Sequence, residues 1–220
     1  MVINLLNNID KKYIIIIIFI LSIICINNFY ENIKIITETN KLLILVNKNN
    51  KLPKDYIPSE LILLNNKYSI ENKYLQKEVA INFEKLSEDA SKLGYKIIAA
   101  SAYREYEYQE ILYNYYVETK GLEYADNCSA RPGHSEHQTG LAVDVMGSNN
   151  DYNKFEESNE FKWMENNAHK YGFILRYPKN KTHITGFKYE PWHYRYVGKK
   201  VATIIYNKNI TLEEYLKEKR

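Results

Sequence analysis

Apolar positions are concentrated in one run near the N-terminus. Residues 13–26 are apolar except for Ser22, and Lys11 and Lys12 precede them. Because positive charge before an apolar run keeps that end of a chain in the cytoplasm, the remainder is expected to lie outside the membrane. The run is shorter than the ~20 residues that span a bilayer, and its length also fits the core of a signal peptide. No small-residue cleavage site follows it, so we predict an uncleaved membrane anchor, with a cleaved signal as the alternative.

This run divides the chain into three parts. We predict a cytoplasmic tip and an anchor or signal segment over residues 1–29, a polar-to-mixed linker over residues 30–41, and a folded domain over residues 42–220. A domain of that length can bury an ordinary hydrophobic core. We expect it to work outside the cytoplasmic membrane, as part of a single-pass protein or as a secreted one if the segment is removed.

Within the domain, apolar positions recur with the periods of both helices and strands. In residues 72–93 they follow at threes and fours, which predicts an amphipathic helix, and residues 105–120 are also helix-like. Short apolar runs predict strands at Leu42–Val46 and Tyr95–Ala100. Residues 50–73 contain two prolines and scattered aliphatic residues, which favours an extended arm around the domain.

Another short strand is predicted where apolar and polar residues alternate near the middle of the chain. Its two faces carry Leu141, Val143 and Val145 on one side and Ala142 and Asp144 on the other. The glycine before the strand, Gly140, indicates a bend that brings His137 back beside Asp144. A histidine and an aspartate on adjacent backbone segments supply two of the three protein ligands of a metal site, and the third ligand is still missing.

A candidate for the third ligand lies near the C-terminus. His193 is expected on a strand, with aromatic residues such as Tyr194 packed on the opposite face. Pro191 interrupts regular strand pairing, which lets Glu190 turn toward the same side as His193. A glutamate in that position could reach water at a metal without being a ligand itself.

These residues complete the donor set of a catalytic zinc site, which needs three protein ligands and an open position for water. We predict one zinc ion with the ligands His137, Asp144 and His193, and Glu190 as the base. His134 is a weaker candidate, because ligation by both His134 and His137 would displace Asp144.

Composition excludes other classes of function. The net charge is +3, and the basic residues are interspersed with acidic ones. This charge pattern does not indicate a basic surface that binds nucleic acid. Its two cysteines, Cys25 and Cys128, are far apart and on different predicted segments. An intramolecular disulfide is therefore not expected.

Two segments carry a resemblance to a known family. SEHQTGLAVD at residues 135–144 and EPWH at residues 190–193 resemble the D-alanyl-D-alanine carboxypeptidases of the vancomycin-resistance VanY type. These belong to a superfamily that also groups lysostaphin and the hedgehog signalling domain. Four further motifs occur in the matching order, at residues 101–104, 106–109, 171–178 and 210–216.

The resemblance implies a role for each site residue. His137, Asp144 and His193 would bind zinc, Glu190 would be the catalytic base, and Arg104 would stabilise the oxyanion. The substrate would contact Ser135, Gln109 and Tyr177. From charge alone, Arg176 is a further candidate for binding the substrate carboxylate, and Arg131 is either a substrate contact or a structural salt bridge.

The resemblance and the residue patterns together predict an α+β domain. We expect a central antiparallel sheet that carries the zinc, with helices on one side and an N-terminal membrane segment. The expected function is D,D-cleavage of pentapeptide stems of peptidoglycan, which releases D-alanine. The alternatives are L,D-cleavage of tetrapeptide stems and a non-catalytic cell-wall binder. Expected partners are stem peptides ending in D-alanine and the membrane, with the protein acting as a monomer.

Overall fold

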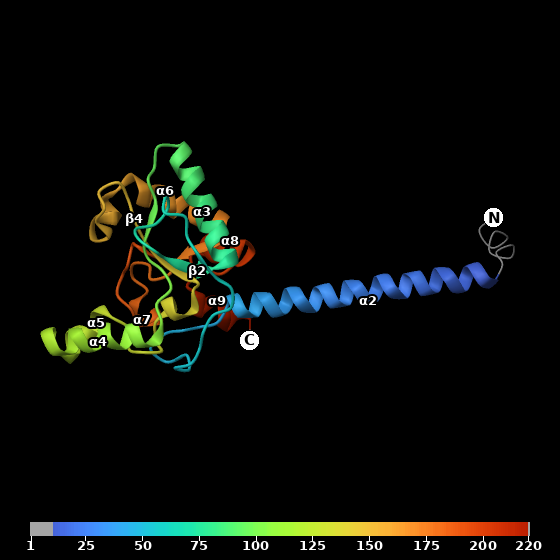
Figure 1. Ribbon diagram of the computed structural model, residues 1–220, viewed down its shortest axis with the longest axis horizontal. Coiled ribbons are helices and arrows are strands. Elements are labelled where there is room, and N and C mark those ends of the chain that lie inside the picture. The colour runs from blue at the N-terminus through green and yellow to red at the C-terminus, as the bar shows by residue number, and fades with distance from the viewer. Residues whose placement is uncertain (1–10, 220) are drawn as a thin grey trace. The chain divides into compact units, whose positions relative to one another are not determined.

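The computed structural model describes residues 11–219. The chain falls into two compact units, Met1–Leu43 and Ile44–Arg220. The first unit contains one long helix, α2 (Lys11–Leu42), coloured blue in Figure 1. The linker predicted at residues 30–41 is thus helical in the structure, as a continuation of the apolar run. Apolar side chains along Ile16–Tyr30 are exposed. Within residues 11–219, no helix meets the length and apolarity that crossing a membrane requires, and residues 1–10 of the predicted anchor segment lie outside the described part.

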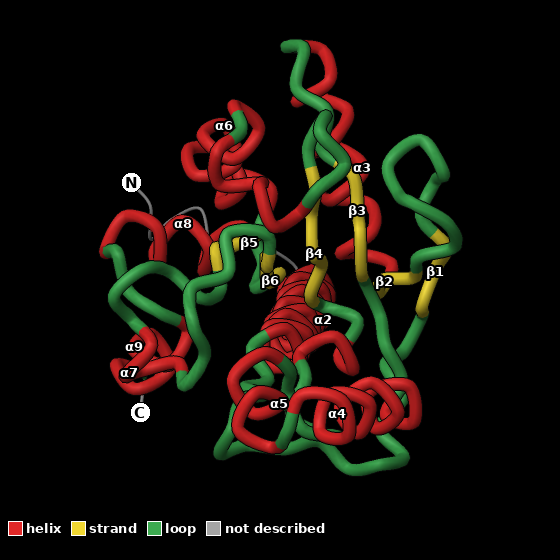
Figure 2. The backbone as a smooth tube through the Cα atoms, turned by 90° about the vertical axis from the view of Figure 1, so that its left-hand side faces the viewer, coloured by secondary structure: helices red, strands yellow, loops and turns green. Residues whose placement is uncertain are grey.

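The second unit is built on a four-stranded sheet with the order β3-β4-β6-β5 (Figure 2). Every neighbouring pair in it is antiparallel, as predicted. The strands are β3 (Ile98–Ser101), β4 (Ala142–Met146), β5 (Phe173–Leu175) and β6 (His193–Tyr196). The two central strands, β4 and β6, are the two that carry predicted metal ligands.

The register between β4 and β6 determines which side chains share a face. Asp144 lies opposite His193, and Val143 lies opposite Tyr194. Directly opposed residues project to the same side of a sheet, so Asp144 and His193 share one face while Val143 and Tyr194 share the other. The alternation read from the sequence is therefore confirmed for both strands.

The second face of the sheet is closed by helix α3 (Lys77–Lys92). Phe83 of this helix lies edge-on to Phe173, with ring centroids 6.1 Å apart, and Phe173 in turn contacts Tyr196 at 5.1 Å. All three rings are buried. Burying several aromatic side chains is worth roughly 1.5–3 kcal/mol each, so these contacts hold the strand that carries His193.

Two predicted elements near the start of the domain differ from the structure. Leu42–Val46 contains no strand, because α2 ends at Leu42 and the following residues form a loop in which Val46 is fully buried. The helix predicted from residue 72 begins later, since β2 (Tyr74–Gln76) pairs with β1 (Leu61–Leu63). β1 lies in the segment predicted to be an extended arm, and its backbone hydrogen bonds hold residues 74–76 in a strand.

The next two predictions are closer to the structure. β3 begins at Ile98 rather than Tyr95, because the Tyr95 amide still donates to the carbonyl of Ala90 at the end of α3. The helix predicted over residues 105–120 is confirmed as α4 (Tyr106–Lys120). A short helix, α5 (Leu122–Cys128), follows it.

Helices border both faces of the sheet, so the expectation of helices on one side only is wrong. On the face that carries Asp144 and His193, helices form part of the wall of a cavity. The lining residues include Leu112 and Tyr116 of α4 and Cys128 of α5. The remaining helical segments are η1 (Glu136–Thr139), η2 (Tyr152–Glu157), α6 (Asn159–Asn167), η3 (Ala168–Tyr171), α7 (Thr182–Thr185), α8 (Lys199–Lys208) and α9 (Leu212–Glu218).

Candidate active site

The three predicted metal ligands converge in the structure. One ligand atom from each of His137, Asp144 and His193 lies within 4.8 Å of the others. The Asp144 carboxylate is shared between the two imidazoles, with Oδ2 3.2 Å from Nε2 of His137 and Oδ1 2.8 Å from Nδ1 of His193. Two imidazole nitrogens and a carboxylate oxygen are a donor set that zinc commonly takes in catalytic sites.

The bend expected before β4 is what brings His137 to Asp144. His137 lies in the short helix η1, which ends at Gly140 with the left-handed φ of 67°. A Cβ at Gly140 would lie only 3.0 Å from Cδ2 of Leu61, so the turn is both left-handed and tightly packed. Only glycine meets both conditions without strain.

Hydrogen bonds to the other ring nitrogens leave the correct atoms facing the metal position. Nδ1 of His137 lies 2.6 Å from the carbonyl of Ala102, which can only accept, so Nδ1 carries the proton and Nε2 is free to ligate. Nε2 of His193 lies 3.5 Å from Oε2 of Glu136, while Nδ1 of His193 faces Asp144. Metal-binding histidines characteristically donate their second nitrogen to a carbonyl or carboxylate in this way. The residues present therefore fit zinc.

The charge states of the cluster agree with a cation site. Burial alone would raise the pKa of Asp144, but the imidazoles of His137 and His193 hold it well below its usual range. Burial alone would lower the pKa of His193, but hydrogen bonds to Asp144 and Glu136 raise the pKa to about 9. The site thus stabilises positive charge. When the imidazoles lose their protons, a bound metal ion would supply that charge instead.

Glu190 is placed beside this cluster by a turn. The amide of His193 donates to the carbonyl of Glu190 over 3.1 Å, and Pro191 takes the second position of the turn. Glu190 lines the same cavity as the three ligands, which has a volume of about 310 Å³. Burial, partly opposed by the charge of His193, raises the pKa of the Glu190 carboxyl to about 7. A carboxylate with that pKa can take up and return a proton near neutral pH.

Arg104 also lines the cavity, and its guanidinium is held from two sides. Nη1 donates to Oε1 of Gln109 over 2.6 Å, and Nη2 donates to Oγ of Ser101 over 3.0 Å. Gln109 is itself buried, and its Nε2 donates to the carbonyl of Ala130 over 2.7 Å. Gln109 is not among the residues that line the cavity. In this structure Gln109 orients Arg104, and its contact with substrate stays a prediction.

The arginine at position 104 is expected to matter for rate more than for metal binding. Replacing Arg104 with alanine should lower kcat by about 100- to 1,000-fold, the usual cost of losing one donor to a developing oxyanion. Zinc content should not change, because Arg104 is not a ligand. Arg131→Ala is the matched control, since Arg131 forms an exposed salt bridge with Asp126 at 2.8 Å. Equal losses of kcat in the two variants would contradict the role of Arg104.

Two further predicted substrate contacts line the cavity, Ser135 and Tyr177. The Tyr177 ring stacks on the ring of His193, with centroids 4.9 Å apart. Burial raises the pKa of the Tyr177 hydroxyl well above its usual value, so the hydroxyl remains a hydrogen-bond donor. Their contact with substrate stays a prediction.

The sequence interpretation missed a buried ionic cluster behind the ligands. Glu136 has no exposed side-chain surface, and its Oε1 accepts from Nε of Arg176 and Nη1 of Arg195, each over 2.7 Å. Arg176 also binds Glu213 of α9, at 2.6 and 2.9 Å. Arg176 is fully buried and does not line the cavity, so the suggestion that it binds the substrate carboxylate is wrong. The one available signal was that Arg195 shares a strand face with His193.

His134, which precedes His137 by three residues, does not point toward the predicted metal ligands. Nδ1 of His134 lies 2.8 Å from the carbonyl of Asn47, away from the three ligands. Arg131 likewise forms the structural salt bridge that was one of its two expected roles. Cys25 and Cys128 are free thiols, as predicted.

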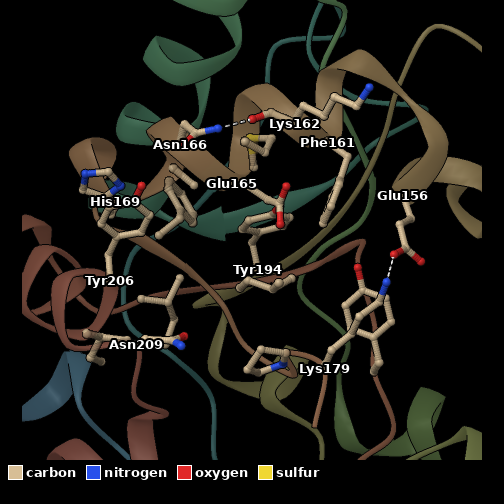
Figure 3. A pocket seen from close by; sticks show the side chains of 18 of the residues that line it. Glu156, Phe161, Lys162, Glu165, Asn166, His169, Lys179, Tyr194, Tyr206 and Asn209 are labelled. Carbon is tan, nitrogen blue, oxygen red and sulfur yellow. Dashed lines mark hydrogen bonds and ion pairs between the residues drawn. The ribbon is translucent and has the colours of Figure 1, made fainter. Parts of the chain in front are cut away.

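A larger cavity, of about 780 Å³, lies on the opposite face of β6, where Tyr194 contributes to its wall (Figure 3). Its rim includes the ion pair between Glu156 and Lys179, and its wall includes the stacked rings of His169 and Tyr206. In the part of the chain that the structure describes, the cluster of three metal-binding side chains occurs in the smaller cavity and not here. The chemistry is therefore assigned to the smaller cavity.

Comparison with known proteins finds carboxypeptidases among the relatives of this chain. A Bacillus subtilis (strain 168) protein, YodJ, that is named as a carboxypeptidase is 42% identical over 195 residues, covering 86% of this chain and 71% of its own. The solved structure of the LdcB LD-carboxypeptidase is 45% identical, with a TM-score of 0.76 over 80% of this chain and 86% of LdcB.

A zinc-bound relative is also known. The vancomycin-resistance D,D-pentapeptidase VanY, solved as a variant in complex with Zn(II), is 37% identical with a TM-score of 0.69. The match covers 80% of this chain and 99% of that one. The family model described as VanY, D-alanyl-D-alanine carboxypeptidase, matches residues 72–199, which include all three predicted ligands and Glu190. The chain belongs to the VanY family of D-alanyl-D-alanine carboxypeptidases.

Proposed function

We propose that this protein is a zinc carboxypeptidase that removes the C-terminal D-alanine from peptidoglycan stem peptides. The observation that carries the proposal is the convergence of His137, Asp144 and His193 in one cavity with Glu190 and Arg104. Together these residues supply a metal site, a base with a pKa near neutral and a permanent cation. An intact set of this kind favours an enzyme over a non-catalytic cell-wall binder.

Each residue has a distinct task in the hydrolysis. Zinc bound by the three ligands would supply a Lewis acid that lowers the pKa of water to about 7. Glu190 takes the proton of the attacking water and then delivers it to the nitrogen of the leaving D-alanine. Arg104 donates to the carbonyl oxygen as that oxygen gains negative charge. Ser135 and Tyr177 lie where they can contact the bound peptide.

We propose D,D-cleavage of pentapeptide stems as the main reaction. The family description and the D,D-pentapeptidase relative support it. L,D-cleavage of tetrapeptide stems is a second candidate, because identity and TM-score are both higher for the LD-carboxypeptidase LdcB. The same metal, base and cation serve either bond, so the fit of the stem peptide in the cavity decides between them.

The test is incubation of the protein with purified pentapeptide and tetrapeptide stems, followed by mass analysis of the products. Loss of one alanine from the pentapeptide alone is the expected result. If only the tetrapeptide loses alanine, the protein has L,D-specificity and the proposed D,D-specificity is wrong. If neither peptide is shortened by zinc-loaded protein, the carboxypeptidase proposal fails.

The location outside the cytoplasmic membrane and the monomeric state are further parts of the proposal. The exposed apolar side chains between Ile16 and Tyr30 support a membrane-associated segment, since large exposed apolar surfaces mark interaction sites. Release of the protein from membranes by detergent but not by high salt would support the membrane-associated segment, whereas release by salt alone would contradict it. Light scattering of the detergent-released protein would test the monomeric state.

A further inference from the structure

Glu136 is buried directly behind the metal site and has no part in the mechanism above. One of its oxygens, Oε1, accepts from the guanidinium groups of Arg176 and Arg195. The other oxygen, Oε2, faces Nε2 of His193 at 3.5 Å, the outer limit of a hydrogen bond. One carboxylate therefore joins the ionic cluster to a metal ligand.

We propose that Glu136 is the positioning residue that makes His193 a metal ligand through Nδ1. An imidazole can ligate through one nitrogen only if that nitrogen is unprotonated, so the proton must reside on the other. A carboxylate beside Nε2 accepts that proton in a hydrogen bond and leaves the Nδ1 lone pair directed toward the Asp144 side. This inference rests on the zinc site of the proposed function.

The ionic cluster explains how Glu136 stays charged while fully buried. Oε1 of Glu136 accepts from Nε of Arg176 and from Nη1 of Arg195, each over 2.7 Å, and hydrogen bonds from two guanidinium groups favour the ionised carboxylate. Arg176 is in turn balanced by Glu213 of α9, so two carboxylates face two guanidinium groups. A charged carboxylate is therefore maintained beside His193 without solvent.

The chain of contacts also fixes the carboxylate in place. Arg176 follows β5 and Arg195 lies on β6, so two separate segments hold the Glu136 side chain directly, and Glu213 of α9 holds Arg176 in turn. Nη2 of Arg195 is itself anchored, since it donates to the carbonyl of Ile44 over 2.8 Å. Because Glu136 precedes His137 directly, the same anchor restrains two of the three ligands.

Glu136→Gln tests this role with minimal change in shape. The glutamine oxygen can still accept from the two arginines, but its amide nitrogen then presents N–H groups toward Nε2 of His193. His193 is driven toward the tautomer with the proton on Nδ1, which cannot bind zinc through Nδ1. We expect zinc affinity, measured by competition with a chelator, to fall by about 10- to 100-fold although no ligand has been removed.

Glu213→Gln is the matched control, because it makes the same chemical change in the same cluster. Glu213 contacts Arg176 but is not in hydrogen-bond contact with His193, so zinc affinity should change by less than about threefold. Thermal unfolding of both zinc-free variants separates loss of stability from loss of metal binding. Equal zinc affinities for the wild type and the Glu136→Gln variant would overturn the inference, as would equal losses in the two variants.

A second measurement needs no variant. In the zinc-loaded wild type, nitrogen NMR of the imidazoles should show the His193 proton on Nε2 and the metal on Nδ1. A proton on Nδ1 would overturn the proposal even if the Glu136→Gln variant failed to fold. Failure of the wild type to bind zinc at all would instead contradict the proposed function.

Discussion

Removal of zinc is expected to abolish the release of D-alanine, and added zinc is expected to restore it. The physical reason is that Glu190 alone cannot make water a strong nucleophile near neutral pH, whereas a metal that lowers the pKa of water to about 7 can. The measurement is D-alanine released by protein treated with chelator, dialysed and assayed with and without zinc, with the metal content determined in parallel. Cleavage that continues after the metal is shown to be gone would end the metallohydrolase assignment.

Histidine variants locate that metal. His137→Ala removes one of the three ligands, so the variant should lose zinc and, with it, nearly all turnover. His134→Ala is the matched control, because His134 is three residues away and binds the carbonyl of Asn47 instead. It should retain zinc and activity. Loss of zinc in the His134 variant with retention in the His137 variant would reverse the ligand assignment.

Loss of the Glu190 carboxylate should produce the second large effect. Glu190→Ala is expected to lower kcat by about 100- to 10,000-fold, the range attributed to a positioned acid or base. Zinc content and thermal stability should remain close to those of the wild type, since Glu190 is not among the three ligands. This combination separates an enzyme from a cell-wall binder, whose binding would not depend on the carboxylate.

Glu165→Ala provides the control for Glu190. Glu165 is an exposed glutamate that lines the larger cavity on the other side of the sheet, so its removal should leave kcat unchanged. If Glu190→Ala had the same kcat as Glu165→Ala, a residue other than Glu190 would have to be the base. A Glu190 variant that lost zinc would instead place the carboxylate among the ligands.

Some parts of the fold and site were predictable because they depend on local patterns. Alternation along residues 141–145 correctly placed Asp144 on one strand face, and the glycine at position 140 correctly marked the bend before it. The helix over residues 105–120 was predictable for the same reason, since its period needs no distant partner. By contrast, residues 74–76 had the pattern of a helix and form a strand, because β1 supplies hydrogen bonds that the local pattern does not contain.

The roles of individual polar residues were harder to predict. Gln109 and Arg176 both belong to matching motifs, and both were candidates for binding substrate. In the structure Gln109 holds Arg104, and Arg176 is buried between Glu136 and Glu213. A glutamine or arginine has the same chemistry in a cavity and in a buried cluster, so the residue type alone does not distinguish the two.

By itself, the sequence determined which residues are the candidates for the ligands and the base, and it determined the strand faces, because these follow from residue type and from the period of a strand. Only the tertiary structure decided which nitrogen of each histidine is directed toward the predicted metal position. That choice depends on the carbonyl of Ala102 for His137 and on Glu136 for His193, which are 35 and 57 residues away along the chain. Contacts between such distant segments form only when the chain is folded, and they set the proton positions on which metal binding depends.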